Sequence, residues 1–594
     1  MRILLVSSAF NSLTQRVFVE LRDRGHLVGV QLALGDDVLR EAARRYAPEL
    51  ILAPMLTSAI PADVWSAHTC LIVHPGPVGD RGPSSLDWAL HEGARQWGVT
   101  VLQADAVMDG GDVWATASCA VPVGVTKSGL YRGEISDAAL EAVLLAVERV
   151  ASGDHVPRRQ ADLPAVGRTR PYFAQSLRRI DWQRDGTAAV LRALRAADSQ
   201  PGVADELCGA EWFLHGGHPE YRLRGRPGEL LATHAGAVCR ASADGAVWIP
   251  ELRARKRPGG TSGIKLPAAL ALGALLPELP ELPASLERTE RTELPGVGAA
   301  VDGGFWTDIR YREAESVGVL DFAFPGGAMS TDHCRRLLAA YRAACTRPTS
   351  VLVLGGGRDF FSNGIHLHVI EAAADPAEES WANIQAMDDL VEAVLTTTDR
   401  ITVSALGGNA AAGGVMLALA ADEVWCRSGV VLNPHYRLMG LYGSEYWTYT
   451  LPRRVGTDAA RRLTQEALPV SAAAARRLGL VDRIVHCGPE DFAGQVRVLA
   501  ARMSAGAEAA GPVAGATELP DAPRWTRPEN DRSVKPLSAY REEELARMRD
   551  IFFDPRAPYH ALRRAFVRKW RPTASPEQFG ALPGALPGAA TRPG

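Results

Sequence analysis

The chain has 594 residues, which corresponds to about four domains of a typical ~150 residues. It carries 65 lysines and arginines against 68 aspartates and glutamates, and the net charge of −3 excludes a protein held mainly by nucleic-acid phosphates. With 46% hydrophobic and 22% charged residues, the composition is that of a soluble protein with more than one buried core.

The cysteine pattern and the hydropathy indicate in which cellular compartment the protein works. The eight cysteines lie singly, without a CxxC pair, so no metal site is predicted and a reducing compartment is favoured. The longest apolar stretch, Ala410–Ala421, is shorter than the ~20 residues needed to cross a bilayer. The N-terminal MRILLV reads as a first buried strand rather than a signal peptide. We therefore expect a cytoplasmic protein with no membrane or nucleic-acid partner.

Up to about residue 155, short apolar runs alternate with amphipathic segments. Strands are expected at 3–6, 27–32, 50–52 and 71–73, and helices at 15–24 and 38–46. This alternation predicts an α/β fold with an open, mostly parallel sheet. Glycine-rich turns then separate short segments such as 237–241 and 247–252, which favours a small β-barrel behind one helix at 186–196.

A stretch with four prolines, 275–298, is expected to be an extended linker. Beyond it, strands are predicted at 317–322, 351–354 and 401–405, and helices at 332–344, 379–396 and 471–478. Ser471 and Gly479 are typical start and stop signals for the last of these helices. A second linker, rich in Ala, Gly and Pro, precedes a charged helical tail with a disordered end.

Two loops of the first half carry groups suited to proton transfer. One strand ends at His74 in TCLIVHPGPVGDRGPSSLDWAL, and another ends near Asp109 in GVTVLQADAVMDGGDVWATA. Ligands of open α/β sheets collect where strands end, so both side chains are expected in one crevice. An imidazole and a carboxylate can then exchange a proton near neutral pH. On composition alone, a polar loop without function is an equal alternative.

Both segments resemble the folate-dependent formyltransferases, the group that contains methionyl-tRNA formyltransferase, over about residues 1–262. The resemblance implies a Rossmann-type sheet in which His74 and Asp109 are catalytic. RRIDWQRDGTAAVLRAL is similar to the start of the second, β-rich domain of methionyl-tRNA formyltransferase. The residues that the resemblance implies for the 10-formyltetrahydrofolate site are Met55, Ile72, Arg81 and Asp105.

One position departs from that family. Its asparagine falls at Ile72, which cannot donate a hydrogen bond to the oxyanion of a tetrahedral intermediate. Losing one such donor costs about 10²–10³ in rate. The domain is therefore either a relic or serves a different acceptor. A thiol is attractive, because a thiolate is a good nucleophile and is more abundant near neutral pH than an unprotonated amine.

Two glycine loops mark the second half. VLVLGGGRDFFSNGIHLHV and VSALGGNAAAGGVMLALAAD each lead from a strand into glycines, and the second enters a helix. Glycine lets a ligand approach the backbone, and a helix N-terminus offers unpaired N–H groups. Two such loops can aim two donors at one carbonyl oxygen. Tight helix packing is the alternative explanation for these small residues.

In this order and separation, the two loops resemble the crotonase (enoyl-CoA hydratase/isomerase) family over about residues 315–500. The resemblance implies a crotonase-like α/β domain with an oxyanion hole formed by the amides of Ile365 and Gly413. The segment FAFPGGAMSTDHCRRL is similar to the one that contacts CoA. The CoA-binding residues implied by the resemblance are Ala328, Met329, Ser362 and Gly364.

The acids of the hydratases are missing. Their two glutamates fall at Met416 and Tyr436, so addition of water to an enoyl double bond lacks its general acid and base. What remains beside the oxyanion hole is a phenol, Tyr436, and a carboxylate, Glu445. The sequence does not assign which of the two is the acid and which the base.

Together with the tail KPLSAYREEELARMRDIFFDPRAPYHALRRAFVRKW, the two halves resemble the HypX (HoxX) family of NiFe-hydrogenase maturation factors. The resemblance implies synthesis of CO for the hydrogenase iron centre, by formyl transfer from 10-formyltetrahydrofolate to CoA and decarbonylation of formyl-CoA. The expected partners are small-molecule substrates and hydrogenase maturation proteins. The implied divisions are a folate-binding domain (1–165), a β-rich domain (166–270), a linker (271–300), a crotonase-like domain (301–503), a flexible linker (504–534) and a helical tail (535–594).

Two other functions stay open. The first is formyl transfer to the amine of a tRNA or a sugar nucleotide, with the crotonase-like part as a passive partner; Ile72 argues against it. The second is a non-catalytic scaffold that binds folate and CoA during hydrogenase assembly. Loss of the asparagine and of both glutamates makes this second function reasonable.

Overall fold

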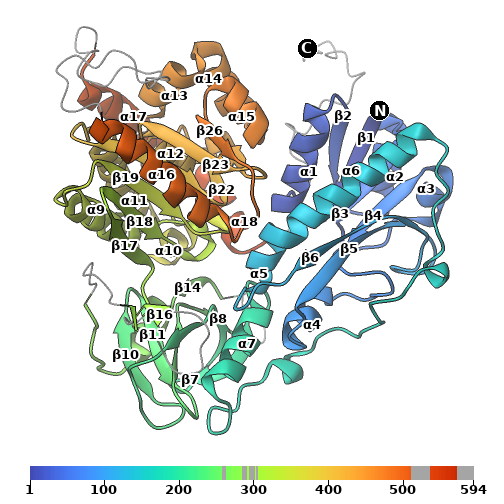
Figure 1. Ribbon diagram of the computed structural model, residues 1–594, viewed down its shortest axis with the longest axis horizontal. Helices are drawn as coiled ribbons and strands as arrows, with labels where there is room; N and C mark the ends of the chain where they lie inside the picture. Colours follow the sequence, from blue (N-terminus) through green and yellow to red (C-terminus); the bar gives the residue numbers. More distant parts are fainter. Residues whose placement is uncertain (257–262, 284–290, 293–300, 303–305, 510–534, 571–594) are drawn as a thin grey trace.

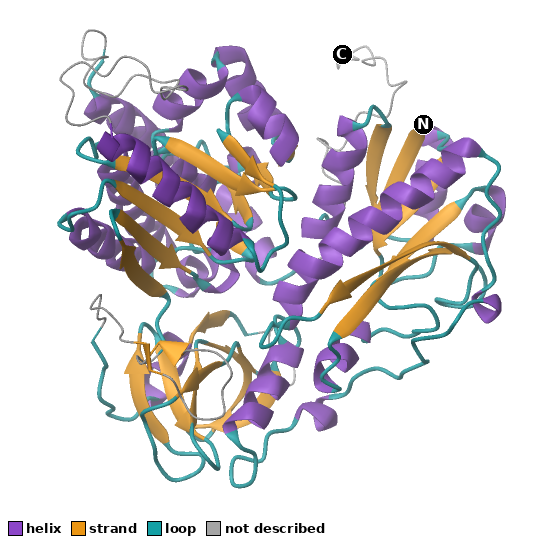
Figure 2. Cartoon of the chain, in the orientation of Figure 1, coloured by secondary structure: helices purple, strands orange, loops and turns teal. Residues whose placement is uncertain are grey.

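The computed structural model describes residues 1–256, 263–283, 291–292, 301–302, 306–509 and 535–570 (Figure 1). We divide it into an N-terminal unit (1–178), a β-rich unit (179–283), a C-terminal unit (306–509) and a tail (535–570). The β-rich unit lies below and between the two α/β units in the view of Figure 2. The predicted fold class, two α/β parts joined by a β-rich part, is confirmed.

The N-terminal unit is built on a six-stranded sheet ordered β2-β1-β3-β4-β5-β6, in which only the last two strands are antiparallel to their neighbours. Alternate residues of its first strand enter two cores, Ile3 and Leu5 on one face and Leu4 and Val6 on the other. Helices cover both faces, which explains the continuous apolar runs. The elements are β1 (Arg2–Ser7), α1 (Ser12–Asp23), β2 (Leu27–Leu32), α2 (Asp36–Tyr46), β3 (Leu50–Met55), α3 (Ala62–Ala67), β4 (Cys70–His74), α4 (Ser85–His91), β5 (Gln96–Gln103), β6 (Val113–Ala120), α5 (Lys127–Leu130) and α6 (Ser136–Ser152).

The β-rich unit consists of two four-stranded sheets, ordered β10-β11-β12-β9 and β14-β13-β8-β7, with the predicted helix packed on them. The single strand predicted at 247–252 is wrong. Pro250 has no N–H for a sheet, so one strand ends before it and the next begins after it in the other sheet. The elements are α7 (Thr187–Ala197), β7 (Val203–Leu207), β8 (Ala210–His215), β9 (His218–Glu220), β10 (Leu230–His234), β11 (Ala237–Ala241), β12 (Ala246–Ile249), β13 (Glu251–Ala254), β14 (Lys265–Pro267) and α8 (Ala268–Leu272); β15 (Arg291–Thr292) and β16 (Val301–Asp302) follow as a short pair.

The C-terminal unit has a six-stranded sheet ordered β17-β18-β19-β21-β23-β26 and a small second sheet ordered β20-β22-β24-β25. In β19, Leu352 and Leu354 face α9, α11 and α12, whereas Val351 and Val353 face α16. The elements are β17 (Ile309–Ala314), β18 (Val317–Phe322), α9 (Thr331–Cys345), β19 (Val351–Gly356), β20 (Phe360–Ser362), α10 (Leu367–Ala372), α11 (Pro376–Leu395), β21 (Ile401–Leu406), β22 (Asn409–Ala411), α12 (Gly413–Leu419), β23 (Glu423–Arg427), β24 (Val431–Asn433), α13 (Trp447–Val455), α14 (Thr457–Glu466), β25 (Val470–Ser471), α15 (Ala472–Leu478), β26 (Arg483–Val485) and α16 (Phe492–Ala509).

The end signals predicted for α15 are present. The Ser471 side chain accepts a hydrogen bond from the Ala474 N–H at 3.0 Å, and Gly479 follows the helix with φ +91°. The tail forms α17 (Leu537–Phe553) and α18 (Pro558–Val567), as its charged pattern predicted. Both helices pack on the C-terminal unit, with Met548, Phe552 and Tyr559 against Ile384. The predicted disordered end lies outside the described residues. In the part of the chain that the structure describes, no helix is long and apolar enough to span a bilayer.

Near three of the predicted domain boundaries, the chain packs on, or continues into, elements outside the predicted domain. Residues 166–173, assigned to the second domain, pair with the N-terminal unit, where Thr169 forms a bridge with Arg81. The first half of the predicted 271–300 linker packs on β10, because the Leu282 N–H donates to the Thr233 carbonyl at 2.8 Å. Helix α16 continues to Ala509, and Ser504 within it is buried. In each case the backbone finds hydrogen-bond partners that lie far away in the sequence.

A buried charge network joins the N-terminal and C-terminal units. Asp137, near the start of α6, forms ion pairs with Arg16 of α1 and, at 3.0 Å, with Arg427 of β23. The side chains of Arg16 and Arg427 are only 9% and 5% exposed. Val431 of the C-terminal unit completes the N-terminal core, and Arg358 pairs with Glu134 at 2.6 Å. The relative orientation of the two units is therefore fixed by specific contacts.

Asp137→Ala leaves two buried guanidinium groups without their shared carboxylate. We expect a loss of about 2–3 kcal/mol of stability, because an unpaired buried charge is costly. The measurement is the midpoint of thermal or urea unfolding. As the control, Asp37→Ala removes a partner of Arg40 that is 98% exposed, and its midpoint should not change. A wild-type midpoint for Asp137→Ala would show that this contact does not hold the units together.

Candidate active site

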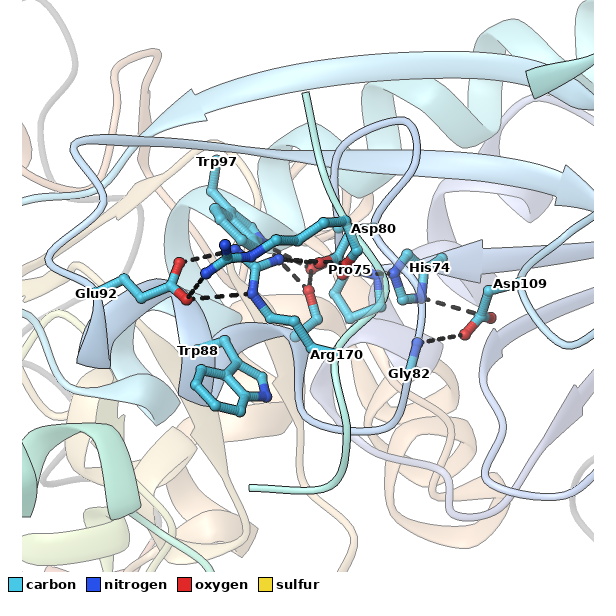
Figure 3. A network of polar contacts seen from close by, with 12 residues as sticks. His74, Pro75, Asp80, Gly82, Trp88, Glu92, Trp97, Asp109 and Arg170 are labelled. Atoms are coloured by element: carbon cyan, nitrogen blue, oxygen red, sulfur yellow. Dashed lines mark hydrogen bonds and ion pairs between the residues drawn. The ribbon is translucent and has the colours of Figure 1, made fainter. Parts of the chain in front are cut away.

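His74 lies at the end of β4 between two carboxylates (Figure 3). Its Nε2 is 2.9 Å from Asp80 Oδ2, and its Nδ1 is 3.5 Å from Asp109 Oδ1. The structure thus brings His74 and Asp109 together, as the sequence predicts. Because each ring nitrogen faces a carboxylate oxygen, the imidazole can pass a proton from one side of the site to the other. The two partners differ in exposure: the Asp80 side chain is 1% exposed and that of Asp109 is 13% exposed.

The loop after β4 folds tightly enough to present both His74 and Asp80. A Cβ on Gly76 would lie 2.3 Å from Asp80 Oδ2 and 2.5 Å from His74 Nε2, so only glycine permits this contact. The carbonyl of Gly76 accepts a hydrogen bond from Thr100 Oγ1 at 2.8 Å, and that of Pro75 accepts one from Trp97 Nε1 at 2.9 Å. These bonds anchor the loop to β5.

Arg170 extends the network, from a segment that returns to the N-terminal unit (Figure 3). Its Nη1 donates to Asp80 Oδ1 and its Nη2 to Glu92 Oε2, both at 2.7 Å. Hydrogen bonding to Arg170 lowers the pKa of Glu92. Sequence reasoning missed Asp80 and Arg170. Asp80 could have been found as a carboxylate in the histidine loop, whereas no local signal marks Arg170, 90 residues away.

The predicted folate-site residues occupy different places. Met55, at the end of β3, lines the central cavity described below. Ile72 is half-buried and packs with the apolar cluster around Leu4. The backbone of Arg81 pairs with residues 168–170, and Asp105 lies exposed, where its Oδ1 accepts a hydrogen bond from Val107 N at 2.7 Å.

In the C-terminal unit, the predicted phenol and carboxylate form a direct pair. Tyr436 OH donates to Glu445 Oε2 at 2.8 Å, and both side chains are buried. Burial raises the pKa of Glu445 to about 8 and that of Tyr436 well above its ordinary value. Tyr436 therefore stays a proton donor, whereas Glu445 can gain and lose a proton near neutral pH.

The predicted amide donors lie next to this pair. Gly413 is the first residue of α12, where a backbone N–H has no partner within the helix. A Cβ on Gly364, which has φ +75°, would lie 3.1 Å from Gly413 N, so the two glycine loops approach closely. A Cβ on Gly413 would lie 2.0 Å from Glu445 Oε1. Ile365 and Gly413 both line the cavity.

The predicted CoA contacts divide into two groups. Ala328 lines the cavity. Met329 and Ser362 do not, because their side chains are buried within the unit, where Ser362 Oγ accepts a hydrogen bond from Gly364 N at 3.1 Å. The Met329 N–H donates to the Gly364 carbonyl at 2.8 Å. Through these bonds to Gly364, Met329 and Ser362 shape the loop that carries Ile365.

One cavity of about 890 Å³ lies where the three units meet. The N-terminal unit contributes Met55 and Pro75, the residue after His74, and the C-terminal unit contributes Tyr436 and Glu445. Three cationic side chains that line the cavity, Lys127, Arg132 and Lys265, each form an ion pair with a carboxylate. A volume of this size is suited to a ligand as large as a cofactor. Among the described residues, no cluster of His, Cys, Asp and Glu is arranged to hold a metal ion.

The buried carboxyl groups predict a pH dependence of stability. Burial raises the pKa of Asp388 to about 7 and those of Glu445 and Glu544 to about 8. Unfolded carboxyl groups titrate near pH 4, so the folded protein binds more protons than the unfolded chain up to about pH 8. The stability that these neutral groups contribute is thus lost as the pH rises through the folded pKa values.

We expect the thermal midpoint to fall from about pH 4.5 to about pH 8, and to fall less in Glu445→Gln, which cannot ionise. Differential scanning fluorimetry across this range measures both. The same fall in the two proteins would contradict the raised pKa of Glu445.

Three family models match the chain: Formyl transferase at residues 20–146, Formyl transferase, C-terminal domain at 174–261, and Enoyl-CoA hydratase/isomerase at 312–514. The chain is 47% identical to the hydrogenase maturation factor HoxX of Bradyrhizobium diazoefficiens, over 96% of this chain and 95% of that protein. The crystal structure of HypX from Aquifex aeolicus in complex with tetrahydrofolic acid matches with a TM-score of 0.87 and 40% identity, over 98% of this chain and 99% of that one. The methionyl-tRNA formyltransferase of Variovorax paradoxus is 26% identical over 37% of this chain. The chain therefore belongs to the HoxX/HypX family of hydrogenase maturation factors.

Proposed function

We propose that this protein synthesises the CO ligand of the NiFe-hydrogenase active site in two steps. A formyl group passes from 10-formyltetrahydrofolate to CoA in the N-terminal unit, and formyl-CoA is split into CO and CoA in the C-terminal unit. The observation that carries the proposal is the single cavity that reaches from Pro75, beside His74, to Tyr436 and Glu445. A thioester formed at one end has a path to the other without leaving the protein.

Binding of tetrahydrofolate by the Aquifex relative supports the first substrate, which we place near Met55 and the Asp105–Asp109 loop. We assign the first step to residues 1–165 with the β-rich domain 166–270, and the second to the crotonase-like domain 301–503.

The first step moves one proton. The CoA sulfur attacks the formyl carbon, the carbon–N10 bond breaks, and the thiol proton ends on N10 of tetrahydrofolate. Asp109, the more exposed of the two carboxylates that flank His74, receives the thiol proton, and the imidazole relays a proton toward N10. Ile72 offers no oxyanion donor, and a thiol tolerates this loss better than an amine because its conjugate base is already a good nucleophile.

The second step needs a base and a donor to the carbonyl. The amides of Ile365 and Gly413 polarise the formyl oxygen of formyl-CoA. Glu445 removes the formyl proton, the carbon–sulfur bond breaks with its electrons on sulfur, and carbon leaves as CO. The proton then passes from Glu445 to the thiolate. Tyr436, whose pKa is raised well above that of an ordinary phenol, keeps its proton and holds Glu445 in place.

The central test is incubation of the purified protein with 10-formyltetrahydrofolate carrying a ¹³C formyl group and with CoA, followed by capture of ¹³CO on reduced haemoglobin. We expect carbonyl-haem that contains the label and depends on CoA. Formylated amine products without CO would favour a different formyltransferase. Absence of both would favour a non-catalytic scaffold.

Substitutions in one site should block its own reaction step and leave the other step intact. Glu445→Gln and Tyr436→Phe should lower CO release by at least about 10²-fold, because each removes a group that holds or moves the proton. Formyl-CoA should then accumulate, which liquid chromatography with mass spectrometry detects. The matched variants His74→Gln and Asp109→Asn should show the reverse: no formyl-CoA from folate, but normal CO release from added formyl-CoA. Loss of both activities in a single-site variant would contradict two separate sites.

Asp80→Asn tests the carboxylate that the sequence reasoning missed. The amide has one acceptor oxygen in place of two, so Asp80 can no longer serve both His74 and Arg170. We expect formyl transfer to fall by about 10-fold or more, with the KM for folate little changed. Glu92→Gln, at the other end of Arg170, is the control and should change the rate far less. Equal effects would show that Arg170, and not the contact with His74, explains the loss.

A further inference from the structure

Glu445 sits in a strained turn. The segment from Tyr436 to α13 contains Gly440 and Gly443, both with positive φ, and then two consecutive non-glycine residues in the left-handed region. Glu445 has φ +61° and Tyr446 has φ +59°. Residues with a Cβ avoid the left-handed region, so contacts with neighbouring elements must stabilise the turn. Because the strained backbone carries a reactive carboxylate, we infer that specific contacts hold this side chain in position.

Two buried carboxylates hold this turn, one for each strained residue. Asp388 Oδ1 accepts the Glu445 N–H at 2.8 Å. Glu544 Oε2 accepts the Tyr446 N–H at 2.9 Å, and its Oε1 accepts the Thr448 N–H at 2.8 Å. Both carboxylates are almost fully buried. The first turn of α13 has no side-chain cap of its own, and Glu544 supplies it from another helix.

The two carboxylates come from elements far apart in sequence. Asp388 lies on α11, and it also accepts hydrogen bonds from Ser444 Oγ, which lies 2.9 and 3.0 Å from its two oxygens. Glu544 lies on α17 of the tail, beyond residue 514, where the match to the enoyl-CoA hydratase/isomerase model ends. The tail is held against α11 by Met548 and Phe552. The tail thus reaches the site through the carboxylate of Glu544, and Met548 and Phe566 of the tail line the cavity.

We propose that Asp388 and Glu544 are positioning residues that lock the Glu445–Tyr446 turn, so that the carboxylate of Glu445 stays between Tyr436 and the Gly413 amide. Helix α17 is then part of the decarbonylating site and not an accessory tail. This inference rests on the proposed function of Glu445. It assigns to α11 and α17 the carboxylates that orient Glu445 and that influence its pKa.

The charged groups around Glu445 set its pKa, so the pH dependence of the rate can distinguish a positioning role from a merely structural one. The groups facing it are Tyr436 from its own loop, Asp388 from α11, Glu544 from α17 and Cys334 from α9, while Arg541 of α17 approaches Asp388 at 3.9 Å. After burial itself, the negative charge of Asp388 is the largest cause that raises the pKa of Glu445. Removing this charge must lower the pKa of Glu445, and the rate should then begin to rise at a lower pH.

The experiment supplies formyl-CoA to the full-length protein and measures CO release from about pH 6 to about pH 9. Asp388→Asn keeps an acceptor oxygen but loses the charge, so the acid limb of the profile should move down by about one pH unit. Asp388→Ala also loses the acceptor, and kcat should fall by about 10–100-fold with little change in KM. Glu544→Gln keeps one acceptor for two N–H groups and should lower kcat by about 10-fold.

A neighbouring exposed acid provides a matched control. Glu543→Gln, on the same helix as Glu544 and 70% exposed, should retain the wild-type rate and pH profile. Formyl-CoA synthesis from folate reports in each variant that the chain is folded. If the wild-type protein releases no CO from formyl-CoA, the proposed function fails. If it does, but Asp388→Asn keeps the pH profile and Glu544→Gln keeps the rate of the wild type, the positioning role is refuted.

Discussion

The carboxylate of Asp137, shared by Arg16 and Arg427, is the contact on which the arrangement of the molecule most depends. The central cavity is walled by both α/β units and exists only while they keep one orientation. Guanidinium groups buried at such a junction are stable only when paired, which makes the docking all-or-none. Val431 adds an apolar contact, because it completes the core of the other unit.

The two candidate sites, around His74 and around Glu445, use opposite electrostatic arrangements. Around His74, carboxylates are matched with an imidazole and with Arg170, so charge is paired and the network is suited to relaying a proton. Around Glu445, carboxyl groups crowd together away from water, and burial raises the pKa of each. A carboxyl group with a pKa near neutrality is a far stronger base than an exposed one. The second arrangement therefore gives the C-terminal unit a buried carboxylate that can take up a proton near neutral pH.

Each half keeps the fold of its wider family, but it differs in the side chains that formyltransferases and enoyl-CoA hydratases use for their reactions. Ile72 replaces the asparagine of the formyltransferases, and Met416 and Tyr436 stand where hydratases have glutamates. Met416 has become part of the apolar core. The two glycine loops, by contrast, still lie close together, and a Cβ on Gly413 would collide with Glu445. Backbone donors survive a change of reaction because they depend on the fold and not on the side chain.

The sequence by itself determined the fold class, most strands and helices, and the pairing of His74 with Asp109, because periodicity and strand ends are local signals. It also singled out Tyr436 and Glu445. Only the tertiary structure decided which element each domain boundary follows, that Asp80 and Arg170 flank His74, and that Asp388 and Glu544 hold Glu445. These partners lie up to about a hundred residues from the groups they serve, on helices or loops whose local pattern reads as an ordinary polar surface. Burial turns such a surface carboxylate into a positioning group, and burial is a property of how units pack rather than of the chain.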